Sequence, residues 1–241
     1  MSKSAIDRAH WSRVAQQWTA WARTPNFDAF WAYRDALRAF IGAGQGEALE
    51  VGCGEGRIAR ELKMLGYTVT ASDAAAAMVD AAAAAGSAHA YAVASADALP
   101  FENARFDRVL AYNVLMDVED VPGSLREMRR VLRPGGTLVV SLVHPFWDRG
   151  RFTGPEADAT FVLEGSYFGR EYFEGHEERD GLSMHFAGWS QPLENYAQAF
   201  EAAGLAITSL REPVPDIAAK PELARWTRLP MFLWLKARPL A

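Results

Sequence analysis

The sequence contains little that supports disulfides, metal binding or membrane insertion. Its 241 residues include one cysteine, Cys53, so no intramolecular disulfide can form, which is consistent with a reducing cytoplasm. The histidines are scattered and no His-x-x-x-His or paired cysteines occur, so we predict no metal site. No run of about 18 apolar residues is present, so we expect no membrane span. Residues 1–23 lack the apolar core of a signal peptide, and we expect none.

Positive charge is also scarce. The chain has 25 Lys and Arg against 30 Asp and Glu, a formal net charge of −5, and such a surface repels phosphate backbones. Nucleic acid is therefore disfavoured as a partner. Hydrophobic residues make up 50% of the chain, enough for a sizeable core. Because no long Gly/Ser or charged linker divides the sequence, we predict one domain over 1–241, either monomeric or homodimeric.

The hydrophobic pattern alternates between helices and strands. Helices are expected over 5–23, 27–41, 57–65, 74–85, 121–132 and 194–203, and strands over 48–51, 67–72, 90–94, 106–111, 137–143, 206–210 and 231–237. Arg133-Pro134-Gly135-Gly136 is expected to end the fifth helix. This alternation is typical of an α/β fold in which crossover helices connect parallel strands.

The most informative motif is a glycine-rich loop. Leu49-Glu50-Val51 leads into Gly52-Cys53-Gly54-Glu55-Gly56, and a helix is expected to follow. In an open parallel sheet this first strand-to-helix turn lies where ligands bind. A dinucleotide fold would place its third glycine at position 57, which is Arg57, and Glu50 and Glu55 would repel a pyrophosphate. An acidic loop suits S-adenosylmethionine, which carries a sulfonium and an ammonium but no phosphate. The alternative is a tight turn without a ligand.

Two aspartates follow the next two strands. Asp73 ends the second strand, where an acidic side chain can accept both ribose hydroxyls of an adenosine, although it also suits a helix N-cap. Asp97 follows the third strand and has the right chemistry to accept from an adenine amino group while Leu99 packs on the ring. A simple loop aspartate is the alternative there.

Together these segments resemble the class I S-adenosylmethionine-dependent methyltransferases, and most closely the small-molecule branch that includes ubiquinone and menaquinone methyltransferases. The matching stretches are 50–56, 72–73, 97–101, 106–115 and 125–136, in the expected order and spacing. The resemblance covers roughly residues 45–145. It implies a Rossmann-like seven-stranded sheet, mostly parallel, with helices on both faces and the last strand, 231–237, antiparallel.

The resemblance also implies roles for individual residues. Glu50 and the loop would hold the methionine part of the cofactor, Asp73 the ribose, Asp97 and Ala98 the adenine, and Asn113 would lie near the ammonium. The full set of predicted cofactor-binding residues is Glu50, Gly52, Cys53, Gly54, Gly56, Asp73, Ala74, Met78, Asp97, Ala98, Leu99, Asn113 and Val114.

This sequence departs from familiar relatives after the fourth strand. Met116-Asp117 stands where a His-His pair often follows, so no histidine function is expected there. Tyr112-Asn113-Val114-Leu115 replaces the Asn-Pro-Pro-Tyr motif of many base- and glutamine-methylating relatives. This difference weakens the case for nucleic-acid or protein-amide substrates.

Aromatic residues concentrate after the fifth strand, at the edge of the sheet where the cofactor is expected. Ten occur within residues 144–189, and we predict a substrate-binding insertion over 144–190. Its alternative is a small core or a dimer interface of its own. Trp11, Val14, Trp18 and Trp21 share one helical face, so the region 1–42 is predicted to form a helical lid, although an ordinary packed helix fits equally well. The predicted substrate-binding residues are Trp18, Phe146, Trp147, Tyr167, Tyr172 and Trp189.

Methyl transfer is an in-line displacement, so much of the catalysis can come from positioning the acceptor. A base is needed only where the acceptor must lose a proton. His144 is the first candidate because it ends the fifth strand, with a structural histidine as the alternative. His185 and His176 come next, and Tyr167 or Tyr172 would orient the acceptor.

The sequence thus predicts methyl transfer from S-adenosylmethionine to a small, aromatic or apolar molecule in the cytoplasm. Three alternatives stay open. They are a nicotinamide oxidoreductase, a methyltransferase acting on RNA or protein, and a non-catalytic protein that binds S-adenosylmethionine.

Overall fold

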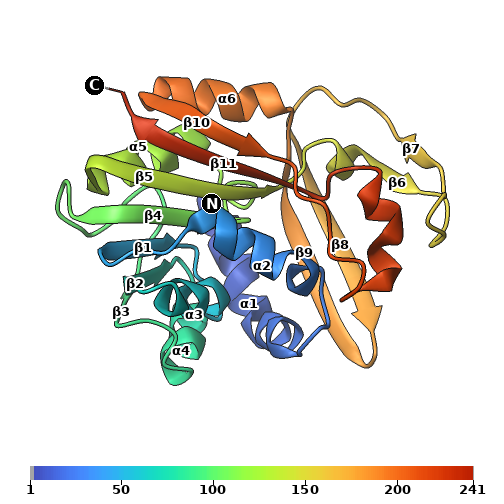
Figure 1. Ribbon diagram of the computed structural model, residues 1–241, viewed down its shortest axis with the longest axis horizontal. Helices are drawn as coiled ribbons and strands as arrows, with labels where there is room; N and C mark the ends of the chain where they lie inside the picture. Colours follow the sequence, from blue (N-terminus) through green and yellow to red (C-terminus); the bar gives the residue numbers. More distant parts are fainter. Residues whose placement is uncertain (1–2, 241) are drawn as a thin grey trace.

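A seven-stranded sheet forms the centre of the molecule (Figure 1), and the computed structural model describes residues 3–240. The strand order is β10-β11-β5-β4-β1-β2-β3. The strands are β1 (Glu47–Val51), β2 (Thr68–Asp73), β3 (Ala90–Val93), β4 (Phe106–Tyr112), β5 (Leu132–Val143), β10 (Leu205–Arg211) and β11 (Phe232–Pro239). Neighbours from β3 to β5 pair in parallel, whereas β11 is antiparallel to both β5 and β10. The predicted Rossmann-like sheet with an antiparallel last strand is confirmed.

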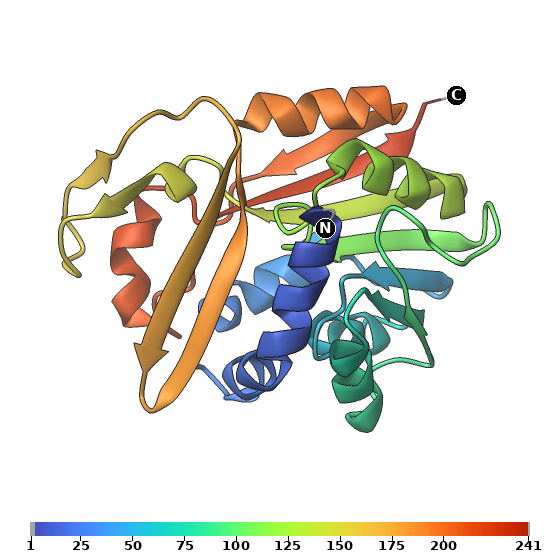
Figure 2. The ribbon, with the colours of Figure 1, turned by 180° about the vertical axis from the view of Figure 1, so that it is seen from behind.

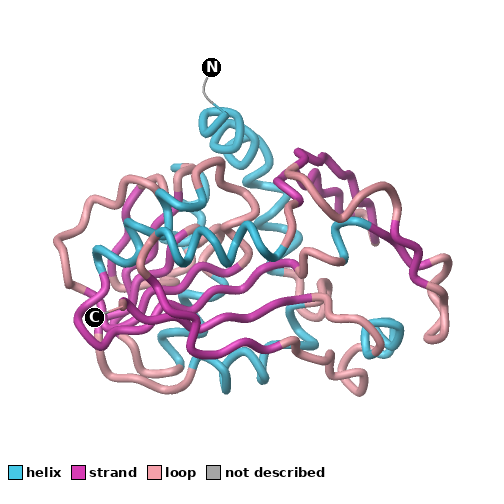
Figure 3. The backbone as a smooth tube through the Cα atoms, turned by 90° about the horizontal axis from the view of Figure 1, so that it is seen from above, coloured by secondary structure: helices cyan, strands magenta, loops and turns pink. Residues whose placement is uncertain are grey.

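Helices cover both faces of this sheet (Figure 3). One face packs against α5 (Val121–Val131) and α6 (Leu193–Ala202), and the other against α2 (Phe30–Ile41) and α3 (Arg57–Met64). The short α4 (Ala76–Ala84) contacts β2 and β3. Successive side chains of a strand point to opposite faces of the sheet. Leu138 and Val140 of β5 therefore pack in the core on the α5 and α6 face, and Val139 packs in the core on the α2 and α3 face.

Strand order reverses between β1 and β4, which are direct neighbours although β2 and β3 come between them in the chain. In open α/β sheets a ligand crevice forms at such a reversal, outside the carboxyl ends of the strands. The loops that follow β1, β2, β4 and β5 therefore meet at one edge. The glycine loop, Asp73 and Asn113 lie at this edge, and Asp97 follows the neighbouring strand β3.

Two peripheral elements lie beside this edge. Figure 2 shows α1 (Lys3–Arg23) running between α4 and a hairpin of β8 (Glu171–Arg179) and β9 (Leu182–Ser190). Val14 and Trp21 of α1 pack with Met184 of β9, while Ala15 packs with Ala75 and Met78 beside α4. The remaining elements are η1 (Trp147–Arg149), β6 (Gly150–Phe152), β7 (Phe161–Leu163) and η2 (Pro221–Thr227).

The largest differences between the expected elements and the structure lie in three places. The second helix begins at Phe30 rather than 27. Strand β5 begins at Leu132 rather than 137, because Arg133–Gly136 belong to the strand. The segment 150–190 forms two small antiparallel hairpins that the hydrophobic pattern did not predict. Within residues 3–240, no helix combines the length and apolar character that crossing a membrane requires.

Candidate active site

The glycine loop after β1 is shaped by close contacts that exclude side chains. Gly52 and Gly54 have φ of 69° and 52°, a region that glycine adopts without steric cost. A Cβ on Gly52 would lie 2.4 Å from a methyl carbon of Val114. A Cβ on Gly54 would lie 2.8 Å from the indole nitrogen of Trp18. The loop is thus held between Val114, in the loop after β4, and Trp18 of α1.

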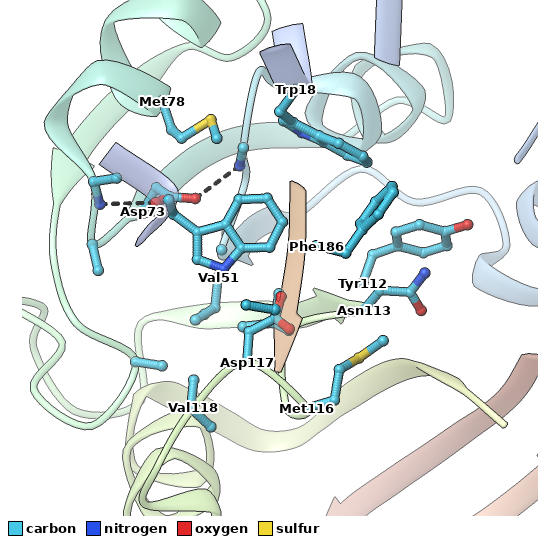
Figure 4. A pocket seen from close by; sticks show the side chains of 18 of the residues that line it. Trp18, Val51, Asp73, Met78, Tyr112, Asn113, Met116, Asp117, Val118 and Phe186 are labelled. Carbon is cyan, nitrogen blue, oxygen red and sulfur yellow. Dashed lines mark hydrogen bonds between the residues drawn. The ribbon is translucent and has the colours of Figure 1, made fainter. Parts of the chain in front are cut away.

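Asp73 fixes the other side of this loop. Its carboxylate accepts a hydrogen bond from the Gly54 backbone N–H and another from the Ala75 backbone N–H, both 2.9 Å long (Figure 4). Burial raises the pKa of Asp73, and these backbone donors offset part of that effect. The carboxylate joins the ends of β1 and β2, and it lines the cavity described below. The cap of α4 is Ala75, without a side-chain cap bond, so the alternative of Asp73 as helix N-cap is wrong. The placement beside the cavity is compatible with the predicted ribose contact.

Glu50 is buried beside Asp73 and forms no ion pair among the described residues, and the Ala59 backbone and the charge of Arg60 offset its burial only in part. It is 1% exposed, and its Oε2 has no hydrogen-bond partner among the described residues. Burial raises the pKa of Glu50 well above its ordinary value, and the nearby carboxylates of Glu55 and Asp73 raise it further. Glu55, in contrast, forms ion pairs with Arg23 and Arg60 at 2.8 and 2.7 Å.

These charges provide a test of whether S-adenosylmethionine fits the site. A buried carboxylate that lacks a partner is costly unless a ligand supplies the opposite charge. The sulfonium and ammonium of S-adenosylmethionine are cations, and no phosphate is present to be repelled by Glu50. The donor set therefore fits this cofactor and does not fit a dinucleotide.

A single cavity of about 820 Å³ connects the glycine loop with the ends of β3, β4 and β5. This volume falls within the range of small-molecule sites, roughly 300–1,000 Å³. Figure 4 shows Asp73 and Met78 toward one side and Asn113, Met116 and Asp117 toward another. Trp18 of α1 and Phe186 of β9 line it as well. The cavity is thus built jointly by the sheet edge, the N-terminal helix and the β8–β9 hairpin.

Asn113 holds an unusual backbone conformation at the end of β4. Its φ is 54°, which asparagine tolerates better than most residues. Its backbone N–H donates to the Ser141 carbonyl at 2.8 Å, and its Oδ1 accepts from the Ser141 hydroxyl at 2.8 Å. These bonds to β5 fix Asn113 in the cavity wall next to Val114.

Helix α1 is fastened to the glycine loop by two arginines. Arg57 donates to the Ala22 carbonyl at 2.9 Å and pairs with Asp28 at 2.8 Å, and its guanidinium lies over the Trp18 ring, 5.4 Å from the centroid. Arg23 bonds Glu55 and, at 2.7 Å, the Ala81 carbonyl of α4. The helix therefore lies across the cavity with defined partners at both sides.

Most of the predicted cofactor-binding residues meet in this cavity. Those that line it are Glu50, Gly52, Cys53, Gly54, Asp73, Ala74, Met78, Asp97, Asn113 and Val114. Three do not line it. Gly56 packs against Ser87, and Leu99 is buried in the core and donates its N–H to Glu127 at 2.9 Å. Ala98 also lies outside the lining.

The predicted substrate-binding and catalytic residues are more dispersed. Trp18 and Trp147 line the cavity, whereas Phe146 stacks on Phe161 and Tyr172 packs on Trp189. The Tyr167 hydroxyl accepts from the Leu193 N–H at 2.9 Å, away from the cavity. His185 stacks on His176, and of these two only His176 belongs to the lining.

His144 lies near the site but outside the cavity lining. Its Nε2 is 3.0 Å from a Glu212 oxygen, and its Nδ1 accepts from the Phe146 N–H at 3.2 Å. Burial lowers the pKa of His144, and Glu212 offsets part of this shift. Both ring nitrogens are thus engaged, which is the arrangement expected of a structural histidine.

Other lining residues were not assigned a site role from sequence. They include Arg8, Trp11, Asp117, Glu119, Asp120, Asp148, Phe173, Glu177 and Ala187. The aromatic enrichment pointed to the region of Phe173. Nothing in the sequence marked Asp148, because its place in the cavity depends on how η1 turns after β5.

The sequence is similar to those of known methyltransferases. A family described as "Methyltransferase domain" matches residues 49–140. The chain is 33% identical over 112 residues to a malonyl-[acyl-carrier protein] O-methyltransferase of Serratia marcescens, covering 45% of this chain and 44% of that protein. It is 38% identical over 116 residues to a demethylmenaquinone methyltransferase of Mycolicibacterium paratuberculosis, covering 47% and 48%.

The similarity to a solved structure extends further along the chain. An S-adenosylmethionine-dependent methyltransferase from Mesorhizobium loti superposes with a TM-score of 0.69 at 29% identity, covering 88% of this chain and 98% of that one. In contrast, the matches to the curated relatives span about half the length of those proteins or less.

Proposed function

Because this chain belongs to the class I S-adenosylmethionine-dependent methyltransferases, we propose that it transfers a methyl group to a small molecule bound in the cavity described above. The observation that carries this proposal is the continuity of that cavity. It extends from Glu50 and Asp73, which suit the cofactor, to the loop after β4 and to Trp147 after β5. One continuous space is thus available to both donor and acceptor.

When bound, S-adenosylmethionine supplies a methyl group activated by its positively charged sulfur. Glu50 and Asp73 provide negative charge where its cationic part and ribose would bind, and Asp97 is the candidate contact for adenine. Asn113 is held rigidly by Ser141 and lines the same space. Since the donor is already activated, the main contribution of these residues is to fix its orientation toward the acceptor.

The lining of the cavity indicates the chemical class of the acceptor. Trp11, Trp147, Phe173 and Phe186 supply aromatic surfaces. Asp117, Glu119, Asp120, Asp148 and Glu177 add carboxylates, whereas the lining arginines are Arg8 and Arg57, and Arg57 already pairs with Asp28. An aromatic or apolar acceptor that is neutral or positively charged fits this balance. An anionic acceptor such as a malonyl carboxylate fits it poorly.

We also propose that α1 acts as a lid. Trp18 lies against Gly54, and Trp21 packs with Phe186 of the hairpin at a centroid distance of 5.9 Å. Removing water from the site strengthens the interaction between its carboxylates and a cationic donor. The general-base role considered for His144 is not favoured, because Glu212 and Phe146 occupy its nitrogens.

A direct test uses S-adenosylmethionine labelled in its methyl group together with a size-fractionated extract of the source cell. Label in the small-molecule fraction is the expected result, and the mass of the labelled species begins to identify the acceptor. Label in RNA or protein would overturn the substrate class. Binding of S-adenosylmethionine without label in any fraction would instead favour a non-catalytic role.

A further inference from the structure

Asp148 is a carboxylate in the cavity that has none of the proposed cofactor-binding roles. It belongs to η1, directly after β5, and lines the cavity together with Trp147 and Gly150. Within residues 3–240, no group donates a hydrogen bond to its oxygens. Its sequence neighbour Arg149 points elsewhere, toward Glu171 and the carbonyls of Gly169 and Ser190.

The location of Asp148 is on the acceptor side of the site. The residues that suit the cofactor come from the ends of β1, β2 and β3, namely Glu50, Asp73 and Asp97. Asp148 follows β5, which lies on the far side of β4 from those strands. A ligand that occupies the β1–β3 side therefore leaves Asp148 facing the remaining space.

The protonation behaviour of Asp148 suits an acid–base role. Burial raises the pKa of Asp148 to about 7, and the charge of Arg149 lowers it only in part. Tyr196 of α6 also senses the charge of Asp148. Burial raises the pKa of Tyr196, the charges of Asp148 and Asp117 raise it further, and a hydrogen bond with Gln191 and the charge of Arg170 lower it. A carboxylate that titrates near neutral pH is matched to accepting a proton under working conditions.

We propose that Asp148 accepts the proton of a hydroxyl or amine acceptor during methyl transfer, an inference that rests on the function proposed above. The acceptor oxygen or nitrogen forms a bond to the methyl carbon, the carbon–sulfur bond breaks, and its electron pair stays on sulfur. The acceptor's own proton passes to a carboxylate oxygen of Asp148 and then to solvent. The substrate class is therefore a neutral phenol, alcohol or amine, rather than a carboxylic acid that is already ionised.

The competing groups in the cavity are less suited to this step. The His176 ring bonds the Ser183 hydroxyl at 2.9 Å and stacks on His185. Burial raises the pKa of Tyr112, so its hydroxyl stays protonated at neutral pH. Asp120 caps α5 by accepting from the Gly123 N–H at 2.8 Å.

The test compares Asp148→Asn, Asp148→Glu and, as a matched control, Asp158→Asn, which changes an exposed aspartate of the same insertion. Each protein receives methyl-labelled S-adenosylmethionine and the small-molecule fraction of the extract, between pH 5.5 and 8.5. We expect Asp148→Asn to lower turnover by about 10²–10⁴-fold, Asp148→Glu to recover part of it, and Asp158→Asn to match wild type. Affinity for S-adenosylmethionine, measured by calorimetry, stays within about twofold in all of them.

The pH profile separates a proton-accepting role from a structural one. Turnover of the wild type should rise with pH through a midpoint near 7, and Asp148→Asn should lose this rise. Infrared difference spectra of wild type minus Asp148→Asn give the titration of the carboxyl group without any substrate. An unchanged profile in Asp148→Asn, or a carboxyl that titrates like an exposed aspartate, would overturn the proposal. If the wild type labels nothing while it binds the cofactor, the proposed function fails, and this inference fails with it.

Discussion

At the residue scale, Asp73 is the side chain on which the donor side of the site depends most directly. It holds the glycine loop through Gly54 and, in our proposal, accepts the ribose hydroxyls. Asp73→Asn should weaken S-adenosylmethionine binding by about 10–100-fold, because hydrogen bonds to a charged acceptor contribute about 1.5–3 kcal/mol. Calorimetry gives the affinity. Asp80→Asn, an exposed change on α4, is the control, and equal affinities in the two variants would contradict the role.

Glu50 presents a conflict between stability and binding. Its pKa is raised in the folded protein, so the folded state holds its proton more tightly than the unfolded chain does. Stability from this group is therefore lost as pH rises from the unfolded pKa toward the folded one. Glu50→Gln should raise the melting temperature of the ligand-free protein at pH 8, by roughly 2–4 °C per kcal/mol gained.

The same substitution should impair binding of the donor, since the carboxylate that faces the cationic ligand is gone. We expect the affinity of the wild type for S-adenosylmethionine to increase with pH and that of Glu50→Gln to be weaker and nearly independent of pH. Scanning calorimetry and binding titrations at pH 6, 7 and 8 measure both effects. A variant that is less stable at pH 8 yet binds normally would contradict this account.

At the element scale, α1 is the part whose proposed role extends beyond packing. Its Trp18 and Trp21 connect the glycine loop with the hairpin. Removing residues 1–23 should weaken cofactor binding and lower turnover, because the cavity loses one wall. Trp18→Ala tests the same idea without exposing the core that α1 covers, and the exposed Ser12→Ala serves as its control. Hydrogen exchange reports whether the fold persists, and full activity in a folded Trp18→Ala variant would argue against a lid.

The elements that the sequence predicted are those with strong local signals. The strands around β1 and β4 are short apolar runs next to glycine or polar turns, and α1 shows a clear helical spacing of tryptophans. The hairpin was missed because β8 reads Glu171-Tyr-Phe-Glu-Gly-His-Glu-Glu-Arg179, a charged and exposed strand without alternation. Such a strand is stabilised by its pairing with β9, which a local pattern does not encode.

The residues of the candidate site also differ in how well the sequence predicted them. Glu50, Asp73 and Asn113 stand at or next to recognisable strand ends, so the sequence predicted that they would lie at the edge of the sheet that forms the cavity. His144 was chosen because it ends β5, but the direction of its ring is set by Glu212, 68 residues away. No sequence motif marked Asp148, because its burial and its place in the cavity depend on the turn that η1 makes after β5. Tertiary packing, rather than motif, decides which side chain at the end of β5 faces the ligand.

At the scale of the whole molecule, the cavity draws its walls from elements spread over the chain, from Arg8 in α1 to Ala187 in β9. A ligand bound there contacts the sheet edge, the helix and the hairpin together, so binding should stabilise all three. Any ligand that binds only the folded state adds RT ln(1 + [L]/Kd), about 2.7 kcal/mol at 100 times Kd. For a chain of this size that corresponds to a rise in melting temperature of roughly 5–10 °C.

S-adenosylmethionine should therefore produce a cooperative shift of this size, whereas NADH should produce none, because its pyrophosphate would lie beside the glycine loop against the buried carboxylate of Glu50. Hydrogen exchange should slow in α1, in the loop after β4 and in β9 within the same titration. Protection confined to the glycine loop would show that the helix and the hairpin do not close over the donor. A comparable shift with NADH would instead contradict the electrostatic argument, since the buried carboxylate of Glu50 beside a pyrophosphate opposes its binding at any position of the lid.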